Sequence, residues 1–203
     1  MKRSIVFLFW LTPLFTQAQQ FAFELWHEGK IVLESSDTLK GLVKYDMQND
    51  LLQVKAKNKL ESFAARKVLF FEIFDTTVKR YRQFYSLPYS QNNTYKTPVF
   101  FELLSEGKLT LLTREKLEYR TVSSPYYYYG NYTQLLVMTN QFFLLKSNGK
   151  IEEFIGKKSD WLSVMENKES EVREFAKENR LDFDDKYELT RIVEYYNSLF
   201  AKK

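Results

Sequence analysis

The residues best suited to ligand binding form a short tyrosine run, which comprises Tyr126, Tyr127, Tyr128, Tyr129 and Tyr132. Pro125 and Gly130 bracket the run between two strand-like segments, so the sequence predicts a loop here. Tyrosine combines a flat apolar face with a hydroxyl group, which suits stacking on sugar rings or anchoring a protein partner. Because loops often carry binding residues, we treat these five tyrosines as candidates. The alternative is that every second tyrosine tucks under the sheet as the flank of a hairpin.

The histidine and cysteine content bears on metal and cofactor binding. His27 is the single histidine and the chain has no cysteine, so a site built from imidazoles and thiolates is excluded. His27 follows Trp26 at a predicted turn, where we expect a structural or solvent-exposed side chain. The Gly-Lys steps of the chain lack the second glycine and the Ser or Thr of a phosphate loop. We therefore expect no cofactor and no metal.

Two glutamates lie within dense apolar segments: Glu72 in residues 68–74 (VLFFEIF) and Glu102 in residues 99–104 (VFFELL). Burial would raise their pKa, and paired carboxylates that meet in space can hydrolyse glycosides. More often such a glutamate points outward from a half-buried strand, so we assign no catalytic residue. A carboxylate-dependent hydrolase acting on envelope polysaccharide stays open as an alternative.

Basic and aromatic residues interleave in residues 78–85, as they do in proteins that bind single-stranded nucleic acid. Alternation on a solvated strand explains the pattern equally well. Removal of residues 1–18 would take away Lys2 and Arg3 and no acid, which lowers the formal charge from +4 to +2. A nearly neutral mature chain argues against a nucleic-acid partner.

The spacing of apolar runs and turn signals predicts an α+β fold in one domain, residues 19–203. Its β-rich part, residues 19–156, is expected to be antiparallel, either a meander or barrel-like sheet or a sandwich. Residues 21–26 read as a strand that turns at residues 27–30, and the dense segments 68–74 and 99–104 read as central strands.

Three Gly-Lys steps, at Gly29, Gly107 and Gly149, each precede an apolar run. Glycine supplies the positive φ of tight turns, so all three are predicted to be hairpins. Residues 86–98, which contain two prolines and two asparagines, read as a long surface loop.

The helical part, residues 157–203, is predicted to supply two to three helices that pack on the sheet. Ser159 is expected to cap a first helix over residues 160–167, and residues 169–179 show helical spacing. Asp185, with Glu188 three residues later, resembles a capping box for the last helix. That helix has the clearest apolar stripe in the chain, formed by Leu189, Ile192, Val193, Tyr196, Leu199 and Phe200.

The first eighteen residues have the layout of a secretory signal peptide. A basic start precedes an apolar run over residues 5–15, and small residues then lead to a cleavage site between Ala18 and Gln19. The run is shorter than the roughly 20 residues of a membrane span. Without cysteine the mature chain cannot carry a lipoprotein anchor. We expect an exported protein, either periplasmic or secreted, with surface association as a further option, that is not integral to the membrane after cleavage.

At the level of whole segments, the chain resembles a family of exported proteins of unknown function common in Bacteroidota. The resemblance rests on the Ala-Gln signal end and on four segments, which are residues 40–46 (KGLVKYD), 98–102 (PVFFE), 106–112 (EGKLTLL) and 191–199 (RIVEYYNSL). It implies export and a shared domain type, and it transfers no catalytic residue.

Taken together, these features favour a non-enzymatic binding module of the cell envelope. Its expected partner is an envelope protein or a glycan, contacted by the tyrosine loop. Besides the hydrolase, a carrier of lipid or another small ligand in an aromatic-lined cavity is an alternative, because the chain holds 14 Tyr and 18 Phe.

Overall fold

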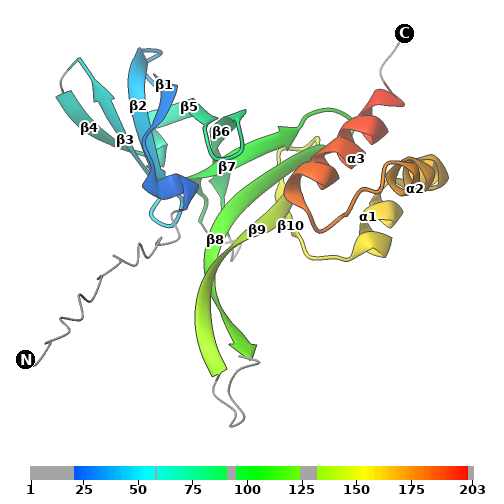
Figure 1. Cartoon of the computed structure of the whole chain (residues 1–203). Helices are drawn as coiled ribbons and strands as arrows, with labels where there is room; N and C mark the ends of the chain where they lie inside the picture. The colour runs from blue at the N-terminus through cyan, green and yellow to red at the C-terminus, as the bar shows by residue number, and fades with distance from the viewer. Residues whose placement is uncertain (1–20, 58, 91–94, 124–131, 201–203) are drawn as a thin grey trace, which may run out of the picture.

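The computed structural model describes residues 21–57, 59–90, 95–123 and 132–200. In these residues ten antiparallel strands form a single sheet, and three α-helices follow near the C-terminus (Figure 1). The predicted α+β class, with a β-rich part followed by helices, is therefore confirmed.

The hydrogen-bonded strand order is β10-β9-β8-β7-β6-β5-β1-β2-β3-β4. The strands are β1 (His27–Leu33), β2 (Thr38–Asp46), β3 (Leu51–Ala56), β4 (Lys59–Ala64), β5 (Val68–Asp75), β6 (Arg80–Tyr89), β7 (Thr97–Ser105), β8 (Thr110–Ser123), β9 (Tyr132–Leu145) and β10 (Ile151–Phe154). Both dense apolar segments predicted as central strands, now β5 and β7, lie inside the sheet. The chain departs from a simple meander once, where a 3₁₀ turn (Ala65–Lys67) carries it from β4 back to the free side of β1.

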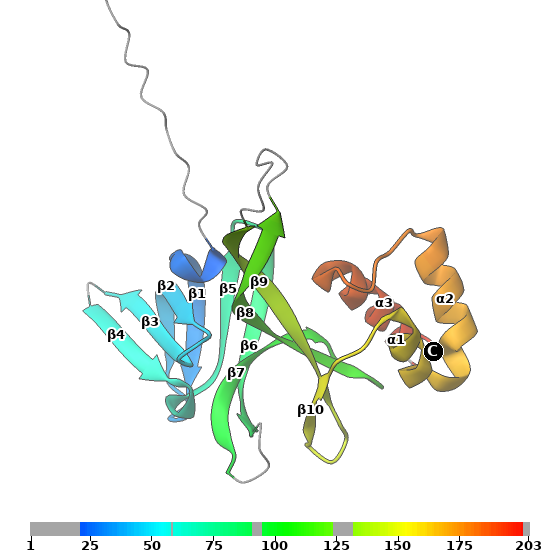
Figure 2. The same cartoon turned by 90° about the horizontal axis from the view of Figure 1, so that it is seen from below.

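The helices are α1 (Lys158–Val164), α2 (Glu169–Glu178) and α3 (Lys186–Ser198). Figure 2 shows all three at the β10 end of the sheet, away from the lobe formed by β1 to β4. The Asp185 side chain caps α3 by accepting from the backbone N–H groups of Tyr187 and Glu188, as predicted. The predicted capping box is incomplete, because the Glu188 carboxylate accepts from the backbone N–H of Asp182 instead of that of Asp185. The predicted Ser159 cap is wrong: α1 begins at Lys158, two residues before the predicted start at Asp160, and the Asp160 carboxylate accepts from the backbone N–H of Lys157 at 2.7 Å.

Two predictions about residues 21–30 are also wrong. Residues 22–24 form a 3₁₀ turn instead of a strand, and residues 27–30 belong to β1 instead of a turn. Gly29 lies opposite Gly41 in the β1–β2 pair, and a Cβ on Gly29 would come within 2.4 Å of the Glu72 carbonyl oxygen. Glycine is needed here for close approach of neighbouring strands, which a turn signal imitates.

The other two glycine hairpins are confirmed. Gly107 lies between β7 and β8, and Gly149, with φ +77°, lies between β9 and β10. The predicted long loop over residues 86–98 is too long, because β6 and β7 remain paired as far as Tyr89 and Thr97, with Pro88 opposite Pro98.

One continuous face of the sheet holds most of the core. Over β1 to β7 the sheet encloses a first apolar cluster that includes Ile31, Phe71, Phe84 and Phe100. Over β8 and β9 the helices cover the same face, in a second cluster built from Leu111, Leu144, Leu162, Val172, Leu189, Ile192 and Val193. A smaller cluster of Phe101, Leu112 and Phe143 lies on the opposite face. The two large clusters leave a gap between them on the shared face.

Candidate functional site

An ionic cluster occupies that gap, and its side chains come from five strands and one helix. We use the name ionic cluster for Tyr45 (β2), Asp75 (β5), Arg82 (β6), Glu102 (β7), Glu115 (β8) and Lys186 (α3). All six residues are buried, and the most exposed of them, Lys186, retains 8% of its accessible surface.

Arg82 is the centre of the cluster. Its Nε and Nη2 donate to the two carboxylate oxygens of Glu102 at 2.9 and 2.7 Å, which is a bidentate pair. Nη2 also donates to Glu115 at 2.5 Å, and Nη1 donates to Asp75 at 2.9 Å. One guanidinium therefore contacts three carboxylates, a geometry that its planar fork of donors permits.

Tyr45 and Lys186 complete the network from opposite sides. The Tyr45 hydroxyl donates to Glu115 at 2.9 Å and accepts from Arg82 Nη1 at 2.9 Å. The Lys186 ammonium lies 3.2 Å from Glu102 and 3.4 Å from Glu115. Lys186 is the first residue of α3, so the cluster joins the start of the last helix to the middle of the sheet.

Strand alternation explains why these polar residues point inward. On β6, Arg82 is two residues from the buried Phe84, and on β5, Asp75 is two residues from the buried Ile73. Side chains two residues apart lie on the same face of a strand. Pairing aligns the strands further, because Phe84 faces Glu102 across β6 and β7. The cluster thus lies along a diagonal of the inward face.

The electrostatic environment favours the ionised forms of Glu102 and Asp75. Burial raises the pKa of Glu102, but the charges of Arg82 and Lys186 outweigh it and leave that pKa below its ordinary value. Burial likewise opposes ionisation of Asp75, while hydrogen bonds from Thr77 and Arg82 hold its pKa below the ordinary value. A raised pKa was expected for Glu102 from its burial. The net shift has the opposite direction, because Arg82 and Lys186 both lie within bonding distance of its carboxylate.

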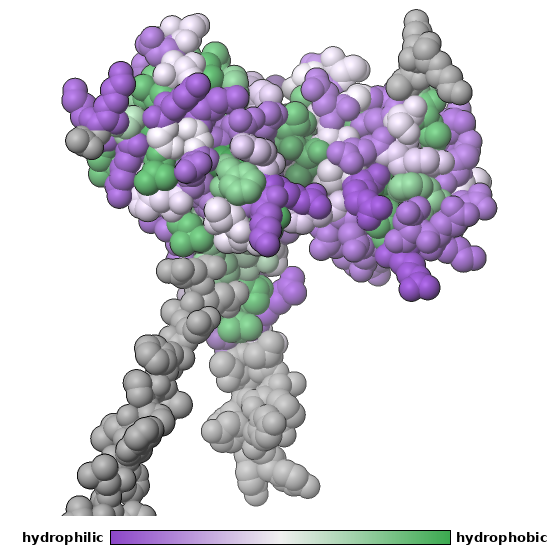
Figure 3. All heavy atoms as spheres, turned by 45° about the horizontal axis from the view of Figure 1, so that its top comes forward, coloured by the Kyte–Doolittle hydropathy of each residue, from purple (hydrophilic) through white to green (hydrophobic). Residues whose placement is uncertain are grey.

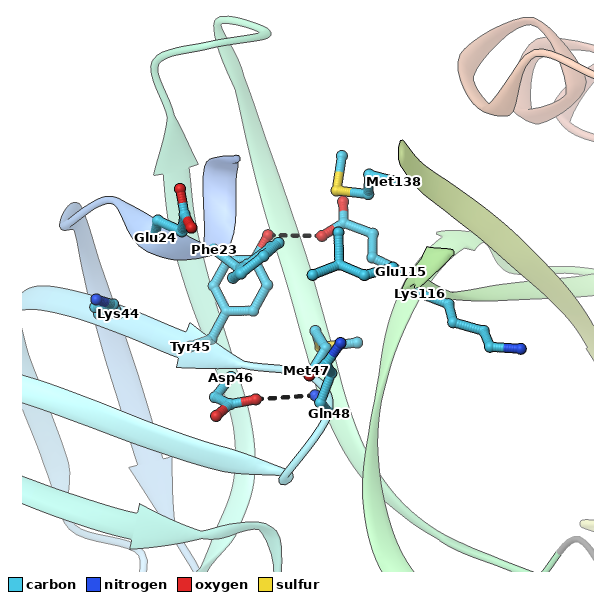
Figure 4. A pocket seen from close by; sticks show the side chains of 11 residues that line it. Phe23, Glu24, Lys44, Tyr45, Asp46, Met47, Gln48, Glu115, Lys116 and Met138 are labelled. Carbon is cyan, nitrogen blue, oxygen red and sulfur yellow. Dashed lines mark hydrogen bonds between the residues drawn. The ribbon is translucent and has the colours of Figure 1, made fainter. Parts of the chain in front are cut away.

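The surroundings of the cluster include two small cavities. One, of ≈ 210 Å³, is lined by Asp75, Arg82, Glu115, Asn140 and Lys186 among others. The other, of ≈ 220 Å³, lies between β2 and β8, where Figure 4 shows the Tyr45 hydroxyl bonded to Glu115 beside Phe23 and Met138. Both glutamates of the cluster are already bonded to cations. Because its pKa is lowered, Glu102 is not poised as the protonated acid that glycoside hydrolysis requires.

A second feature, here called the arm, begins where the cluster ends. The arm is the outer part of the β8–β9 hairpin, residues 114–123 and 132–141. β7 pairs with β8 only as far as Thr113, and β10 pairs with β9 only as far as Phe142. Beyond those residues the two strands pair with each other alone, and Figure 1 shows them leaving the body of the protein.

The inner face of the arm continues the inward face of the sheet and is largely apolar. Its register places Leu117 opposite Met138 and Tyr119 opposite Leu136. Tyr119 is 71% exposed. The outer face is more polar, since Lys116, Glu118 and Arg120 alternate with these residues along β8. In Figure 3 the arm presents apolar residues beside hydrophilic ones.

Ionic contacts on both faces fix the base of the arm. On the inner face Glu115 belongs to the ionic cluster. On the outer face the neighbouring Arg114 lies 2.9 Å from Asp50 and donates to the carbonyl oxygens of Phe100 at 2.7 Å and Met47 at 2.8 Å. Two consecutive residues of β8 thus bind the base of the arm to β2, to the β2–β3 turn, and to β6 and β7.

Most of the residues singled out from the sequence do not meet in this site. Tyr126, Tyr127, Tyr128 and Tyr129 lie outside the described residues, as do Ala18 and Gln19. Tyr132 is the first residue of β9, at the outer end of the arm.

His27 is buried, and its Nε2 lies 2.7 Å from the carbonyl oxygen of Ala22, so its role is structural and its predicted place in a turn is wrong. Glu72 bonds to Lys30 and Gln83 on the other face of the sheet, away from Glu102. Sequence reasoning missed Arg82, which it placed on a solvated strand. Its spacing of two residues from Phe84 was the available signal.

The described residues contain no group of three or more His, Cys, Asp or Glu side chains arranged to hold a metal ion. Among them, no helix has both the length and the apolar character needed to cross a membrane. No family model matches the chain, and no curated protein or solved structure matches it either.

Proposed function

We propose that this chain is an exported, non-enzymatic interaction module of the cell envelope and that the arm is its binding element. The observation that carries the proposal is the geometry of β8 and β9. Among the described residues, their outer halves leave the sheet with no further strand on either side, and the middle of their inner face is apolar, formed by Leu117, Tyr119, Leu136 and Met138. Its partner is an envelope protein or a glycan.

The physical argument concerns stability. An isolated two-stranded ribbon is marginally stable in water, and exposed strand edges normally carry protection against pairing. The arm is nevertheless anchored at its base, because Arg114 pairs with Asp50 in the turn between β2 and β3 and Glu115 pairs with Arg82 of β6. A surface that is anchored at its base and left uncovered is suited to contact with another molecule.

The proposed location rests on the sequence. The signal-peptide layout of residues 1–18, with cleavage between Ala18 and Gln19, supports export. The resemblance to exported proteins of Bacteroidota supports the same assignment. The tyrosine run lies in the sequence between β8 and β9, and we propose it as a second set of binding residues.

Two alternatives have less support. The hydrolase is disfavoured because Arg82 and Lys186 lower the pKa of Glu102 and occupy its oxygens. The carrier needs an enclosed apolar cavity, typically about 300–1,000 Å³. The cavity beside Tyr45 measures ≈ 220 Å³. A larger hollow of ≈ 500 Å³ over Gly29 and Gly41 is open to solvent, and charged side chains line much of it. For the fold we further infer an open sheet that is barrel-like over β5 to β9, in preference to a sandwich of two separate sheets.

Pull-down from envelope extract and from purified envelope polysaccharide tests the proposal. The bait is the mature protein, with Leu117→Thr/Leu136→Thr as the arm variant and Leu60→Thr as the control at an exposed leucine of β4. Tyr127→Ala/Tyr129→Ala tests the tyrosine run separately. We expect the arm variant to lose a partner that wild type and the Leu60 variant both retain. Equal recovery by all variants, with unchanged circular dichroism, would refute the arm as the binding element.

A further inference from the structure

The β8 edge of the arm is a long, unprotected strand edge. β7 leaves β8 after Thr113, so residues 114–123 have no hydrogen-bonding neighbour on that side among the described residues. At about 3.3 Å per residue this edge is roughly 30 Å long. Natural edge strands are usually short, interrupted by proline or a bulge, or guarded by charges of one sign. Residues 114–123 contain no proline, and no register shift is found in this part of the β8–β9 pair.

The charges on this edge are mixed in sign, and their order matters. Lys116, Glu118 and Arg120 follow one another on the outer face as positive, negative and positive. A row of one sign would repel a second copy of itself. A row of alternating sign can instead be complementary to itself when two copies run antiparallel.

We propose that two copies of this chain associate by pairing their β8 edges antiparallel about a two-fold axis, with Tyr119 opposite Tyr119 of the second copy. The inference rests on the proposed role of the arm in binding, but it uses the edge of the arm and leaves the inner face free. A two-fold dimer buries the same patch on both subunits, which is the commonest form of soluble homo-oligomer.

Symmetry restricts the possible registers. A two-fold axis perpendicular to the sheet leaves the inner faces of both copies on the same side. Each residue can therefore lie opposite only a residue of the second copy whose number differs from its own by an even number. Every register is therefore centred on a single residue. Centring on Glu118 places that carboxylate against itself and Lys116 against Arg120, and centring on Arg120 places that guanidinium against itself. Like charges directly opposite are destabilising.

Two registers remain with opposite charges paired. Centring on Leu117 sets Lys116 against Glu118 but also Arg114 against Arg120, and it runs the second copy along the part of β8 that β7 already occupies. Centring on Tyr119 sets Glu118 against Arg120 twice, because of the symmetry, and uses residues 115–123, which β7 leaves free. Aromatic cross-strand pairs also add stability. The Tyr119 register therefore fits the edge best.

Pairing in this register would join the inner faces of the two arms. Leu117 of each copy would lie opposite Thr121 of the other, and the two Tyr119 side chains would meet at the centre. The dimer would then present one continuous apolar surface built from both arms, with the pairs Leu117–Met138 and Tyr119–Leu136 of each copy.

Charge reversal tests the pairing and its register. Glu118→Arg and Arg120→Glu each create like-charge contacts in the dimer, whereas the double variant Glu118→Arg/Arg120→Glu restores opposite charges. The dimer dissociation constant, from sedimentation equilibrium of the mature protein, should rise about tenfold in each single variant, which is roughly 1.4 kcal/mol, and return in the double variant. Glu174→Arg, at an exposed position of α2, is the matched control and should leave it unchanged.

The absence of cysteine from the described residues, and from the whole sequence, permits a second readout. Tyr119→Cys places one thiol at the proposed axis, where oxidation should give a covalent dimer. Leu135→Cys, on β9 of the same arm, should not. A monomeric wild type, a double variant as weak as the singles, or equal cross-linking of both cysteine variants would overturn the proposal. Loss of dimerisation with intact partner capture would refute only this inference, whereas a stable dimer without a partner would refute only the proposed function.

Discussion

Removing the guanidinium of Arg82 tests whether the ionic cluster holds the fold together. In Arg82→Met, a side chain of similar length replaces a residue that makes five hydrogen bonds to four others. Three buried carboxylates then remain, and only Lys186 is left to pair with two of them. Removing one partner from a buried ion pair costs about 3–5 kcal/mol, because the other charge stays buried and unpaired.

That cost should be visible in thermal and denaturant unfolding. For a chain of this size each kcal/mol corresponds to about 2–4 °C, so the midpoint should fall by roughly 6–20 °C. Arg66→Met, at an exposed arginine of the 3₁₀ turn before β5, is the matched control and should stay close to wild type. Arg82→Met/Glu102→Gln should recover part of the loss, because it removes one of the unpaired charges.

The dependence of the unfolding free energy on pH follows from the pKa values of two carboxylates in the cluster. In the wild type the pKa values of Asp75 and Glu102 lie below their ordinary values of 3.8 and 4.5. These groups therefore contribute stability that is present above those ordinary values and is lost as the pH falls through the folded-state pKa. Without Arg82 the desolvation of Glu102 is opposed only by Lys186, so protonation should relieve part of the penalty.

The difference in unfolding free energy between wild type and Arg82→Met should consequently shrink as the pH is lowered from 7 towards 4. Urea unfolding at several pH values measures it. A loss below about 1 kcal/mol at pH 7, the size expected of an exposed pair, would refute the assignment of Arg82 as the centre of a stabilising cluster. So would a loss that does not change with pH.

Three further predictions concern other parts of the chain. Asn197 bonds from α3 to the backbone of the β7–β8 turn, so Asn197→Ala should cost about 1–3 kcal/mol in urea unfolding, and the exposed Asn179→Ala should cost less. A Cβ at Gly41 would lie 2.2 Å from a backbone carbonyl of β3; Gly41→Ala should therefore speed amide hydrogen exchange in β2 and β3. If residues 1–18 are a signal, mass spectrometry of the exported protein should find Gln19 at the N-terminus, and Ala18→Arg should leave the precursor uncut.

The elements of the fold were predictable where local patterns and tertiary packing agree. The α3 stripe and the Asp185 cap are such cases, since burial in the core follows the helical period. The start of β1 was not predictable, because Gly29 satisfies a requirement set by β2 and β5, its neighbours in the sheet. A glycine required by the close approach of a neighbouring strand and a glycine required by a turn cannot be told apart in a single sequence.

The ionic cluster could be predicted only in part, for a similar reason. Arg82 and Asp75 each lie two residues from a buried apolar residue of the same strand, so strand alternation alone could have placed their side chains inside. Glu102 follows two consecutive phenylalanines that are both buried, and its side of the strand is therefore ambiguous. Nothing local connects these residues to Lys186, which lies about a hundred positions further along the chain than Arg82 and is brought to them by packing of α3.

The arm and the ionic cluster both depend on the inward-facing residues of β8, which are every second residue of that strand. The inward-facing residues pass from Leu111, under the helices, to Glu115, in the ionic cluster, and then to Leu117 and Tyr119 on the free arm. The ion pair between Glu115 and Arg82 fixes β8 to the rest of the sheet at the point where apolar packing ends. Without it the base of the arm would be held by β8 and β9 themselves and, on the outer face, by the Arg114 contacts and the Gln141–Glu153 hydrogen bond. The cluster should therefore matter for binding as well as for stability, because it sets the direction in which the apolar face of the arm is held.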